Sequence, residues 1–189
     1  SRCAYFDIDA SAMEKFSKNI NQMEVDLHPC DSAQAVCEAS DVVVTLTAAK
    51  QRNRLIDPAW LHPGQLICAL GGDCPGKTEL DVDLVQQCCV LVEYAPQTRL
   101  EGELQQCPDH DQVIELHQAF SDQSLIRPSE DTWVLFDSVG FAVEDFSALR
   151  VIEALLKAHP ECATVLEWVP NVMDPKDLYG ALVQDTPDV

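Results

Sequence analysis

Short apolar runs alternate with segments of helical pattern along most of this chain, and this alternation constrains its fold more than any other feature. Residues 41–47 and 66–70 are two such runs. Each is predicted to be a buried strand, because apolar residues continue through both faces of the run. Residues 12–20 instead repeat apolar side chains at helical spacing. Strands that alternate with helices predict an α/β fold with a doubly wound, mostly parallel sheet.

The segment 70–80 has the sequence Leu-Gly-Gly-Asp-Cys-Pro-Gly-Lys-Thr-Glu-Leu and follows one of these strands. Gly71 and Gly72 carry no Cβ, so they allow the backbone to turn sharply and to approach a ligand closely. Asp73 and Lys77 then present one carboxylate and one ammonium at the carboxyl end of the strand, where open α/β sheets build their sites. The alternative is a polar loop in which Asp73 only caps a turn.

The same segment partly resembles a Walker phosphate loop, because Gly71 stands five residues before Gly76-Lys-Thr78. Two features argue against that interpretation. Asp73 would place a negative charge in a phosphate cradle, and Pro75 removes an N–H donor. We therefore reject a phosphate-transfer enzyme.

Composition excludes several classes of protein. Lys and Arg number 12 and Asp and Glu 32, so the net charge is −20, which argues against binding nucleic acid or an anionic membrane. No apolar run is long enough to span a membrane. The nine cysteines contain no Cys-x-x-Cys pair and no zinc-like spacing with histidine. We expect reduced, buried thiols, no metal site and a cytoplasmic protein.

Several further elements are predicted from pattern alone. Strands are predicted at residues 3–7, 23–27, 89–93, 132–136 and 163–168. A long helix is predicted after residues 137–140, ending at His159-Pro160, and a short helix at 174–182. Residues 96–106 and 113–120 are predicted to be helices, in which Glu101 and Glu103 are solvated charges and Arg99 is their partner. Asp7 closes the first predicted strand, where a dinucleotide-binding fold uses an acid to bind the adenosine ribose. The seven glycines provide no Gly-x-Gly-x-x-Gly turn, and acids end many strands, so Asp7 is weak support for such a site.

Six groups of residues, taken together, resemble the ornithine cyclodeaminase family, which also includes relatives of mu-crystallin and certain alanine dehydrogenases. The central motif, with its aspartate, is closer to the ornithine cyclodeaminases of that family than to its mu-crystallin-like members. The matching groups are Thr45-Leu-Thr47, Gly71-Gly-Asp-Cys-Pro-Gly-Lys-Thr-Glu-Leu80, Val92-Glu-Tyr94, Gln97-Thr-Arg-Leu-Glu-Gly-Glu-Leu-Gln-Gln106, Phe136-Asp-Ser-Val-Gly-Phe-Ala142 with Glu144-Asp145, and Asp174-Pro-Lys-Asp-Leu178.

The resemblance implies a Rossmann-like NAD-binding domain joined to a domain that binds the amino acid and forms a homodimer. Residues 1–159 are then expected to be the later part of the NAD domain, and residues 160–189 a tail that returns to the other domain. The chain opens at Ser1 without an initiator methionine. We expect the first strand, the glycine-rich loop and the substrate-carboxylate clamps to lie in an absent N-terminal part. The isolated chain is accordingly expected to be inactive.

The resemblance also implies roles for individual residues. Asp73 matches the catalytic acid/base, which also contacts substrate, and Val139 matches a position near the substrate. Cys68 stands where the ornithine cyclodeaminases usually have asparagine. Without the resemblance, Thr47 could simply end a strand and Ser138 could cap a helix. The positions that match cofactor contacts are Asp7, Thr47, Ile67, Cys68, Ala69, Leu70, Lys77 and Ser138.

The activity implied is the NAD-dependent conversion of L-ornithine to L-proline and ammonia through hydride abstraction, cyclisation and re-reduction. A carboxylate at Asp73 suits this chemistry, because the amines must lose and regain protons. A lysine cyclodeaminase or an alanine dehydrogenase-like enzyme would share every motif present. A non-catalytic NAD-binding remnant is the alternative from a different class.

Overall fold

The computed structural model describes residues 2–20, 24–49, 51–72, 74–126 and 129–164. Contacts divide the chain into two compact units, Ser1–Ala142 and Val143–Val189. The predicted domain boundary after residue 159 stays a prediction. None of the helices in the described part of the chain combines the length and the apolar composition that crossing a membrane requires.

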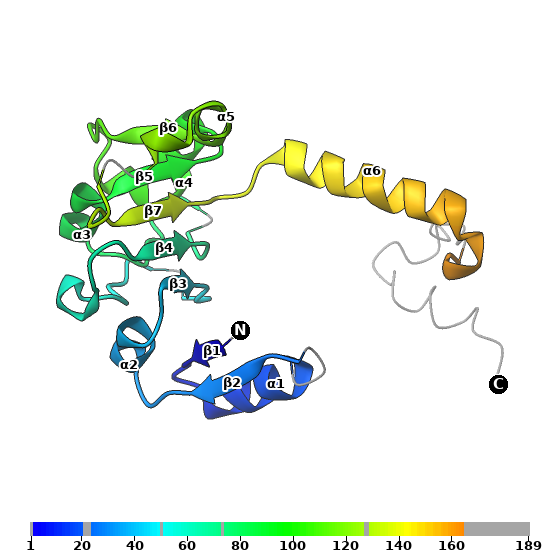
Figure 1. The fold of residues 1–189 in the computed structure, drawn as a ribbon, viewed down its shortest axis with the longest axis horizontal. Coiled ribbons are helices and arrows are strands. Elements are labelled where there is room, and N and C mark those ends of the chain that lie inside the picture. The colour runs from blue at the N-terminus through cyan, green and yellow to red at the C-terminus, as the bar shows by residue number, and fades with distance from the viewer. Residues whose placement is uncertain (1, 21–23, 50, 73, 127–128, 165–189) are drawn as a thin grey trace, which may run out of the picture. The chain divides into compact units, whose positions relative to one another are not determined.

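A five-stranded sheet forms the centre of the first unit (Figure 1). Its strand order is β3-β4-β7-β5-β6, and all four neighbouring pairs are parallel. The predicted α/β fold with a parallel sheet is therefore confirmed, and the carboxyl ends of all five strands meet at one edge. The strands are β3 (Val42–Thr45), β4 (Leu66–Ala69), β5 (Cys89–Val92), β6 (Val113–Glu115) and β7 (Val134–Asp137).

A second, two-stranded sheet contains β1 (Arg2–Tyr5) and β2 (Asp26–Pro29), which are also parallel. The helix α1 (Ala10–Ile20) connects them. Its apolar face packs towards β1, since the rings of Phe16 and Tyr5 lie 4.9 Å apart. The sequence predicted the second strand at 23–27, and the structure shifts it towards the carboxyl end.

Short helices connect the strands, and several begin at side chains that cap them. Ser32 Oγ accepts the N–H of Ala35 at 3.1 Å, and Asp81 Oδ1 accepts that of Asp83 at 2.9 Å. The connecting helices are α2 (Ala33–Glu38), η1 (Pro58–Trp60), α3 (Val82–Gln87), α4 (Ala95–Glu101), η2 (Glu103–Gln106), α5 (Leu116–Ser121) and η3 (Gln123–Leu125).

Two helix predictions are wrong in their extent. Residues 113–120 form strand β6 followed by α5, because Val113 and its neighbours pair with β5. Residues 96–106 break at Gly102 into α4 and η2. The backbone at Gly102 is extended, and the next two N–H groups bind the side chain of Asp137 rather than the preceding turn. A tertiary contact thus overrides helical periodicity at this point.

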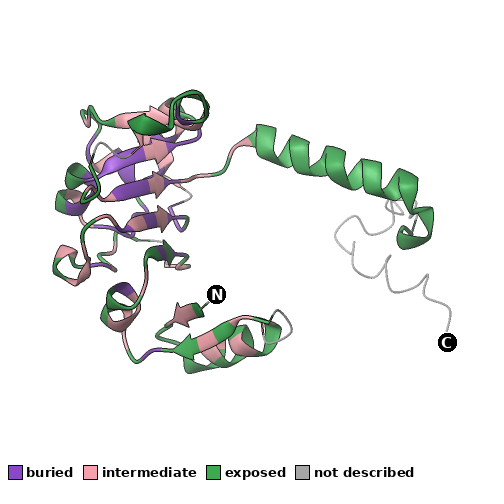
Figure 2. Cartoon of the chain, viewed as in Figure 1, coloured by how far each residue is buried: buried purple, intermediate pink, exposed green. Residues whose placement is uncertain are grey.

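The core lies against one face of the main sheet and includes Ile67, Leu84, Val90 and Leu135 (Figure 2). The prediction that residues 41–47 are buried on both faces is wrong. Side chains of β3 alternate, so that Val43 is buried while Val42 is 50% exposed. An apolar run in the sequence therefore does not by itself show that both faces of a strand are buried.

The described part of the second unit consists mainly of α6 (Ala142–Ala158), whose first residue still belongs to the first unit, followed by η4 (Pro160–Cys162). The predicted long helix is confirmed over this range, and its apolar side chains, including Phe146 and Leu149, are exposed. The predicted strand at 163–168 begins at two described residues without regular structure, and its remainder lies outside the described residues. The predicted helix at 174–182 lies entirely outside them.

The prediction of buried thiols holds for five of the nine cysteines, whereas Cys3, Cys68 and Cys74 are of intermediate exposure and Cys162 is exposed. All nine cysteines are free, and Cys37, Cys88 and Cys107 are among the buried ones. Burial raises the pKa of the Cys88 thiol to about 12, with smaller contributions from neighbouring Cys89 and Cys107. These thiols act as small apolar side chains of the core. In the described ranges, no three His, Cys, Asp or Glu side chains gather closely enough to hold a metal ion.

Candidate functional site

The carboxyl ends of β3, β4 and β7 lie side by side and bring several predicted site residues together. Thr45 pairs with Ala69, and Ala69 pairs with Asp137. The ladder continues one residue further, because Leu70 N donates to Thr45 O and Ser138 N donates to Ala69 O, both at 3.1 Å. Ile67 and Ala69 are buried in the core, whereas Leu70 is 39% exposed at the strand end. Cys68, of intermediate exposure, points to the opposite face from Ile67.

Thr47 lies two residues beyond β3 and is bound to a buried acid. Its backbone N–H and its Oγ1 both donate to Glu79 Oε1, at 2.7 and 2.5 Å. Both donors of Thr47 are therefore engaged within the protein. What the Thr47 hydroxyl still offers a ligand is an acceptor lone pair.

Ser138 is held in a similar way at the end of β7. Its Oγ donates to Glu93 Oε1, from the residue after β5. Glu93 is 8% exposed, and its Oε2 is buried without a hydrogen-bond partner in the described part of the structure. A buried acceptor of this kind fits a ligand that offers an O–H or N–H group. Val139, of intermediate exposure, follows directly.

The segment that follows β4 is anchored by Gln105 of η2. Gly76, whose φ is 87°, donates its N–H to Gln105 Oε1 at 2.6 Å. Gln105 Nε2 in turn donates to Lys77 O at 3.0 Å. Lys77 is only 5% exposed. Asp73, the predicted acid/base, lies outside the described residues, so its role stays a prediction.

Asp7 is the one predicted site residue that belongs to the smaller sheet. It lies two residues beyond β1, it is exposed, and its Oδ1 accepts the N–H of Asp9 at 2.8 Å. The structure therefore assigns Asp7 a local turn contact. Its predicted contact with the adenosine ribose stays a prediction.

Four buried acids at this edge were not predicted as site residues, namely Glu79, Glu93, Glu103 and Asp137. Asp137 accepts the N–H groups of Glu103 and Leu104, both at 2.8 Å. Glu103 accepts those of Glu79 and Leu80, at 2.6 and 3.0 Å. The prediction that Glu103 is a solvated charge is wrong, since its side chain is fully buried.

Arg99 was predicted to pair with Glu101 and Glu103, and its contacts are different. Its guanidinium donates to the carbonyl oxygens of Pro108 and His110, the latter at 2.9 Å. Arg99 thus ties α4 to the segment before β6. The prediction assumed one continuous helix over residues 96–106. The helix ends before Gly102, and Arg99 instead reaches carbonyl groups of the segment before β6.

Gly71 and Gly102 are required by these carboxylates. A Cβ on residue 71 would lie 2.1 Å from Glu79 Oε1, and one on residue 102 would lie 2.5 Å from Asp137 Oδ1. Neither glycine has a positive φ. The sequence predicted that Gly71 permits close approach of a ligand, and in the structure the group that approaches is a buried side chain of the same chain.

Burial changes the protonation of two of these acids. It raises the pKa of Glu103 to about 7, against the lowering effect of the N–H groups of Glu79 and Leu80, and the charges of Asp137 and Glu79 raise it further. Burial also raises the pKa of Asp137 to about 7, against the N–H groups of Glu103 and Leu104, with a further increase from Glu93. Both carboxyls therefore titrate near neutral pH.

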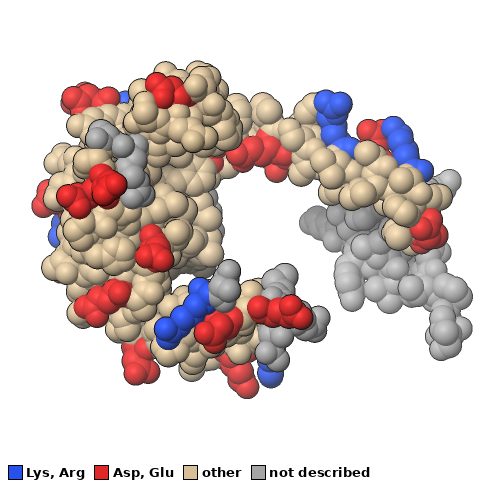
Figure 3. Space-filling view, viewed as in Figure 1, with Lys and Arg blue, Asp and Glu red and all other residues tan. Residues whose placement is uncertain are grey.

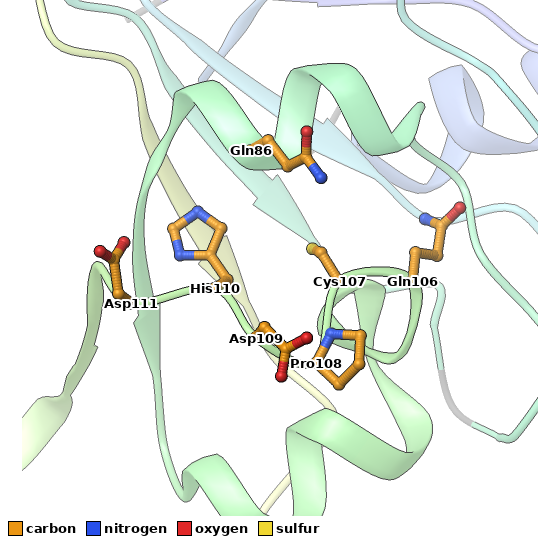
Figure 4. A pocket seen from close by; sticks show the side chains of 7 residues that line it. All are labelled: Gln86, Gln106, Cys107, Pro108, Asp109, His110 and Asp111. Atoms are coloured by element: carbon orange, nitrogen blue, oxygen red, sulfur yellow. The ribbon is translucent and has the colours of Figure 1, made fainter.

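A separate pocket of about 380 Å³ lies between the end of α3 and the segment before β6 (Figure 4). Because that segment leads into β6, the pocket lies towards the amino ends of β5 and β6, away from the site described above. His110 Nε2 lies 3.1 Å from Val85 O, so one side of its ring is engaged within the fold. The lining residues are Gln86, Gln106, Cys107, Pro108, Asp109, His110 and Asp111.

Acidic side chains are distributed over several elements of the face seen in Figure 3. Lys157 and Glu153 form an ion pair of 2.6 Å between two exposed side chains, and an exposed pair of this kind contributes little to stability. The 2.8 Å pair of Arg54 with Asp81 joins an exposed guanidinium to a carboxylate that is only 16% exposed. The absence of nucleic-acid and membrane partners stays a prediction from net charge.

Comparison with known proteins connects this arrangement to one family. The model of the ornithine cyclodeaminase/mu-crystallin family matches residues 1–159. Ornithine cyclodeaminase of Agrobacterium tumefaciens (strain Ach5) is 40% identical over 179 residues, which are 95% of this chain and 50% of that protein. The chain thus spans about half the length of this relative.

Solved structures with a similar fold cover comparable lengths. The structure of a lysine cyclodeaminase that recognises L-lysine, L-ornithine and L-2,4-diaminobutyric acid has a TM-score of 0.77 and 26% identity, over 93% of this chain and 52% of that one. An archaeal alanine dehydrogenase dimer with bound NAD has a TM-score of 0.74 and 21% identity, over 89% and 53%. The latter similarity is one of fold.

Proposed function

This chain belongs to the ornithine cyclodeaminase/mu-crystallin family, and we propose that it is part of an NAD-dependent ornithine cyclodeaminase. The observation that carries this proposal is the 40% identity to ornithine cyclodeaminase of Agrobacterium tumefaciens across 95% of the chain. The reaction converts L-ornithine to L-proline and ammonia without net oxidation. The α-carbon loses a hydride, and the cyclic imine that forms after loss of ammonia regains one.

Residues 1–159 would supply most of the nucleotide site, and residues 160–189 would return to the substrate and dimer domain. NAD, when bound, supplies the acceptance and return of hydride. The archaeal alanine dehydrogenase of the same fold supports this choice of cofactor. The residues that would hold the cofactor are Asp7, Thr47, Ile67, Cys68, Ala69, Leu70, Lys77 and Ser138.

The polar groups at the edge of the sheet suit a nicotinamide nucleotide. Glu93 Oε2 is a buried acceptor without a partner in the described ranges, and it lies beside Ser138. Ribose hydroxyls and a carboxamide offer the donors that such an oxygen requires. Leu70 and Val139 add partly exposed apolar surface to the same edge. The residues present therefore fit the cofactor.

Asp73 is proposed to take protons from the substrate amines and to return them. General acid–base catalysis requires such a carboxylate within hydrogen-bond reach of the reacting nitrogen. The backbone on either side of Asp73 is fixed, which supports this role. The carboxylate of Glu79 packs against Gly71, and the side chain of Gln105 accepts the N–H of Gly76. A negative charge also favours a diamine substrate and a cationic iminium.

A lysine cyclodeaminase is the second candidate. The observation that favours it is the fold similarity, at 26% identity, to a lysine cyclodeaminase that recognises both L-lysine and L-ornithine. Such an enzyme would use the same edge of the sheet and differ in how it accommodates one additional methylene. The choice between the two rests on turnover of each diamine.

The test uses the intact gene product with L-ornithine, L-lysine or L-alanine in the presence of NAD. We expect proline and ammonia from ornithine. The Asp73→Asn variant should lose at least 100-fold in kcat, within the range that general acid–base catalysis contributes. Asp83→Asn is the control, because Asp83 is an exposed residue of α3.

The possible outcomes separate the candidates. Faster turnover of lysine than of ornithine would favour the lysine cyclodeaminase. Wild-type protein that binds NAD but turns over none of the three amino acids would contradict both and support a non-catalytic remnant. The 189-residue chain, assayed by itself, is expected to be inactive.

A further inference from the structure

We propose that Asp137, Glu103 and Glu79 form a positioning series that mechanically couples the end of β7 to the segment after β3. The structural part of this proposal is independent of any activity. Its catalytic part rests on the proposed function, because it concerns the backbone that carries Asp73. These three acids are positioning residues, since each of them binds backbone of the protein itself.

The series follows from the identity of the donors that each carboxylate binds. Asp137 binds the N–H groups of residues 103 and 104, and residue 103 carries the next carboxylate. Glu103 binds the N–H groups of residues 79 and 80, and residue 79 carries the third. Glu79 binds the N–H and hydroxyl of Thr47. Each acid therefore fixes the backbone of the segment from which the next acid extends.

Burial makes these contacts obligatory. The side chains of Asp137, Glu103 and Glu79 are fully buried, so no solvent molecule replaces an acceptor that moves away. Hydrogen bonds in such surroundings of low dielectric constant are stronger than in water, and leaving a buried donor unpaired is costly. A shift of one member should therefore displace the next one rather than be absorbed by water.

The segment 71–80 is held by this series on both sides of residue 73. The carboxylate of Glu79 packs against the α-carbon of Gly71 on the amino side. On the carboxyl side, Gln105 binds Gly76 N and Lys77 O, and it belongs to η2, whose first N–H groups bind Asp137. The series thus positions residues 71, 76 and 77 relative to the ends of β3 and β7.

A simpler interpretation is that each acid holds only the groups that donate to it directly. In that case a substitution would disturb the directly bonded amides and leave the others unchanged. The series makes a different prediction, because loss of one acceptor should also release amides that the substituted residue does not contact. Thr47 is the informative position, since its donors bind Glu79 and, among the described residues, no hydrogen bond joins it to Glu103.

Amide hydrogen exchange of the intact gene product tests this prediction without turnover. Glu103→Gln keeps the shape of the side chain but turns an NH₂ group towards one of the two N–H donors. We expect exchange at residues 79 and 80 to increase at least tenfold, and exchange at Thr47 to increase as well. Glu101→Gln is the matched control, because Glu101 lies two residues away in α4 and its carboxylate accepts only a weak 3.3 Å bond from Gln97.

A second variant starts from the opposite end of the series. Thr47→Ala removes one of the two donors to Glu79 and is compatible with the fold at a position of intermediate exposure. We expect faster exchange at residues 79 and 80 and a smaller increase at 103 and 104. Effects confined to residue 47 in this variant, or to 79 and 80 in Glu103→Gln, would overturn the series.

Kinetics then test the catalytic part. If the wild-type enzyme turns over ornithine, Glu103→Gln should lower kcat about tenfold while the KM for ornithine changes less than threefold, and Glu101→Gln should change neither. Equal kcat values for the two variants would overturn the positioning role in catalysis. A wild-type protein without turnover would contradict the proposed function, and the exchange result would still decide whether the series exists.

Discussion

The carboxylate of Glu79 lies against the α-carbon of Gly71, so that a Cβ at residue 71 would fall 2.1 Å from Glu79 Oε1. Glu79 has little freedom to move away, because its Oε1 accepts two hydrogen bonds from Thr47. The requirement for glycine at this position is therefore steric. It arises from a side chain eight residues further along the chain.

Gly71→Ala should destabilise the protein. The added methyl overlaps a buried carboxylate, and overpacking of this kind costs about 1–3 kcal/mol. Gly72→Ala is the control, since its Cβ would meet its nearest neighbour at 3.6 Å, an ordinary contact. Urea unfolding measures the difference, and equal midpoints for the two variants would contradict the steric argument.

Asp137→Ala should be more severe. It leaves the N–H groups of Glu103 and Leu104 without an acceptor in a buried site, and an unsatisfied buried donor costs about 1–3 kcal/mol. Asp83→Ala, at an exposed position of α3, should stay within about 0.5 kcal/mol of wild type. The free energy of unfolding from denaturant titration distinguishes them, and a neutral Asp137→Ala would show that water replaces the carboxylate.

Stability should fall as pH rises from about 4 to about 7. The folded protein raises the pKa of Glu103 and of Asp137 to about 7, from ordinary values near 4.5 and 3.8. Within this window the native state retains protons that the unfolded chain has released. The contribution is therefore complete below the unfolded pKa values and is lost as pH approaches 7, with a slope of about 1.4 kcal/mol per pH unit for each proton.

Glu103→Gln should reduce that slope, because the variant has no proton to lose at this position. Glu101→Gln, which removes the same formal charge at a side chain of intermediate exposure, is the reference. Unfolding by urea at pH 5, 6, 7 and 8 measures both. A slope in Glu103→Gln equal to that of the reference would show that Glu103 is ionised throughout the window.

Ser138→Ala should weaken binding of NAD to the intact gene product. The Ser138 hydroxyl donates to the buried Glu93 Oε1, and its loss leaves both oxygens of that carboxylate without a described partner. A lost hydrogen bond of about 1 kcal/mol raises Kd about fivefold. Ser147→Ala, in α6, should not change Kd, since Ser147 bonds only its own helix at Val143 O. Calorimetric titration of NAD measures both values.

Sequence reasoning predicted four of the five strands of the main sheet, all except β6, and the loop that follows β4, because short-range patterns determine them. The apolar runs before Leu70 and before Ser138 are strands whichever segments surround them. The helix prediction for residues 113–120 was wrong in its first part, because the two apolar residues Val113 and Ile114 fit a strand and a helix equally. Pairing with β5 decided between the two.

The sequence by itself determined that this chain alternates strand and helix, that its strands run parallel, and that glycine, aspartate and lysine follow β4 at one edge. Only the tertiary structure decided that Glu79, Glu103 and Asp137 are buried, that Asp137 binds the backbone of Glu103, and that Glu103 binds the backbone of Glu79. The physical reason is that the burial of a carboxylate depends on donors from distant segments, 24 and 34 residues away for Glu103 and Asp137. No local pattern distinguishes such an acid from a solvated one.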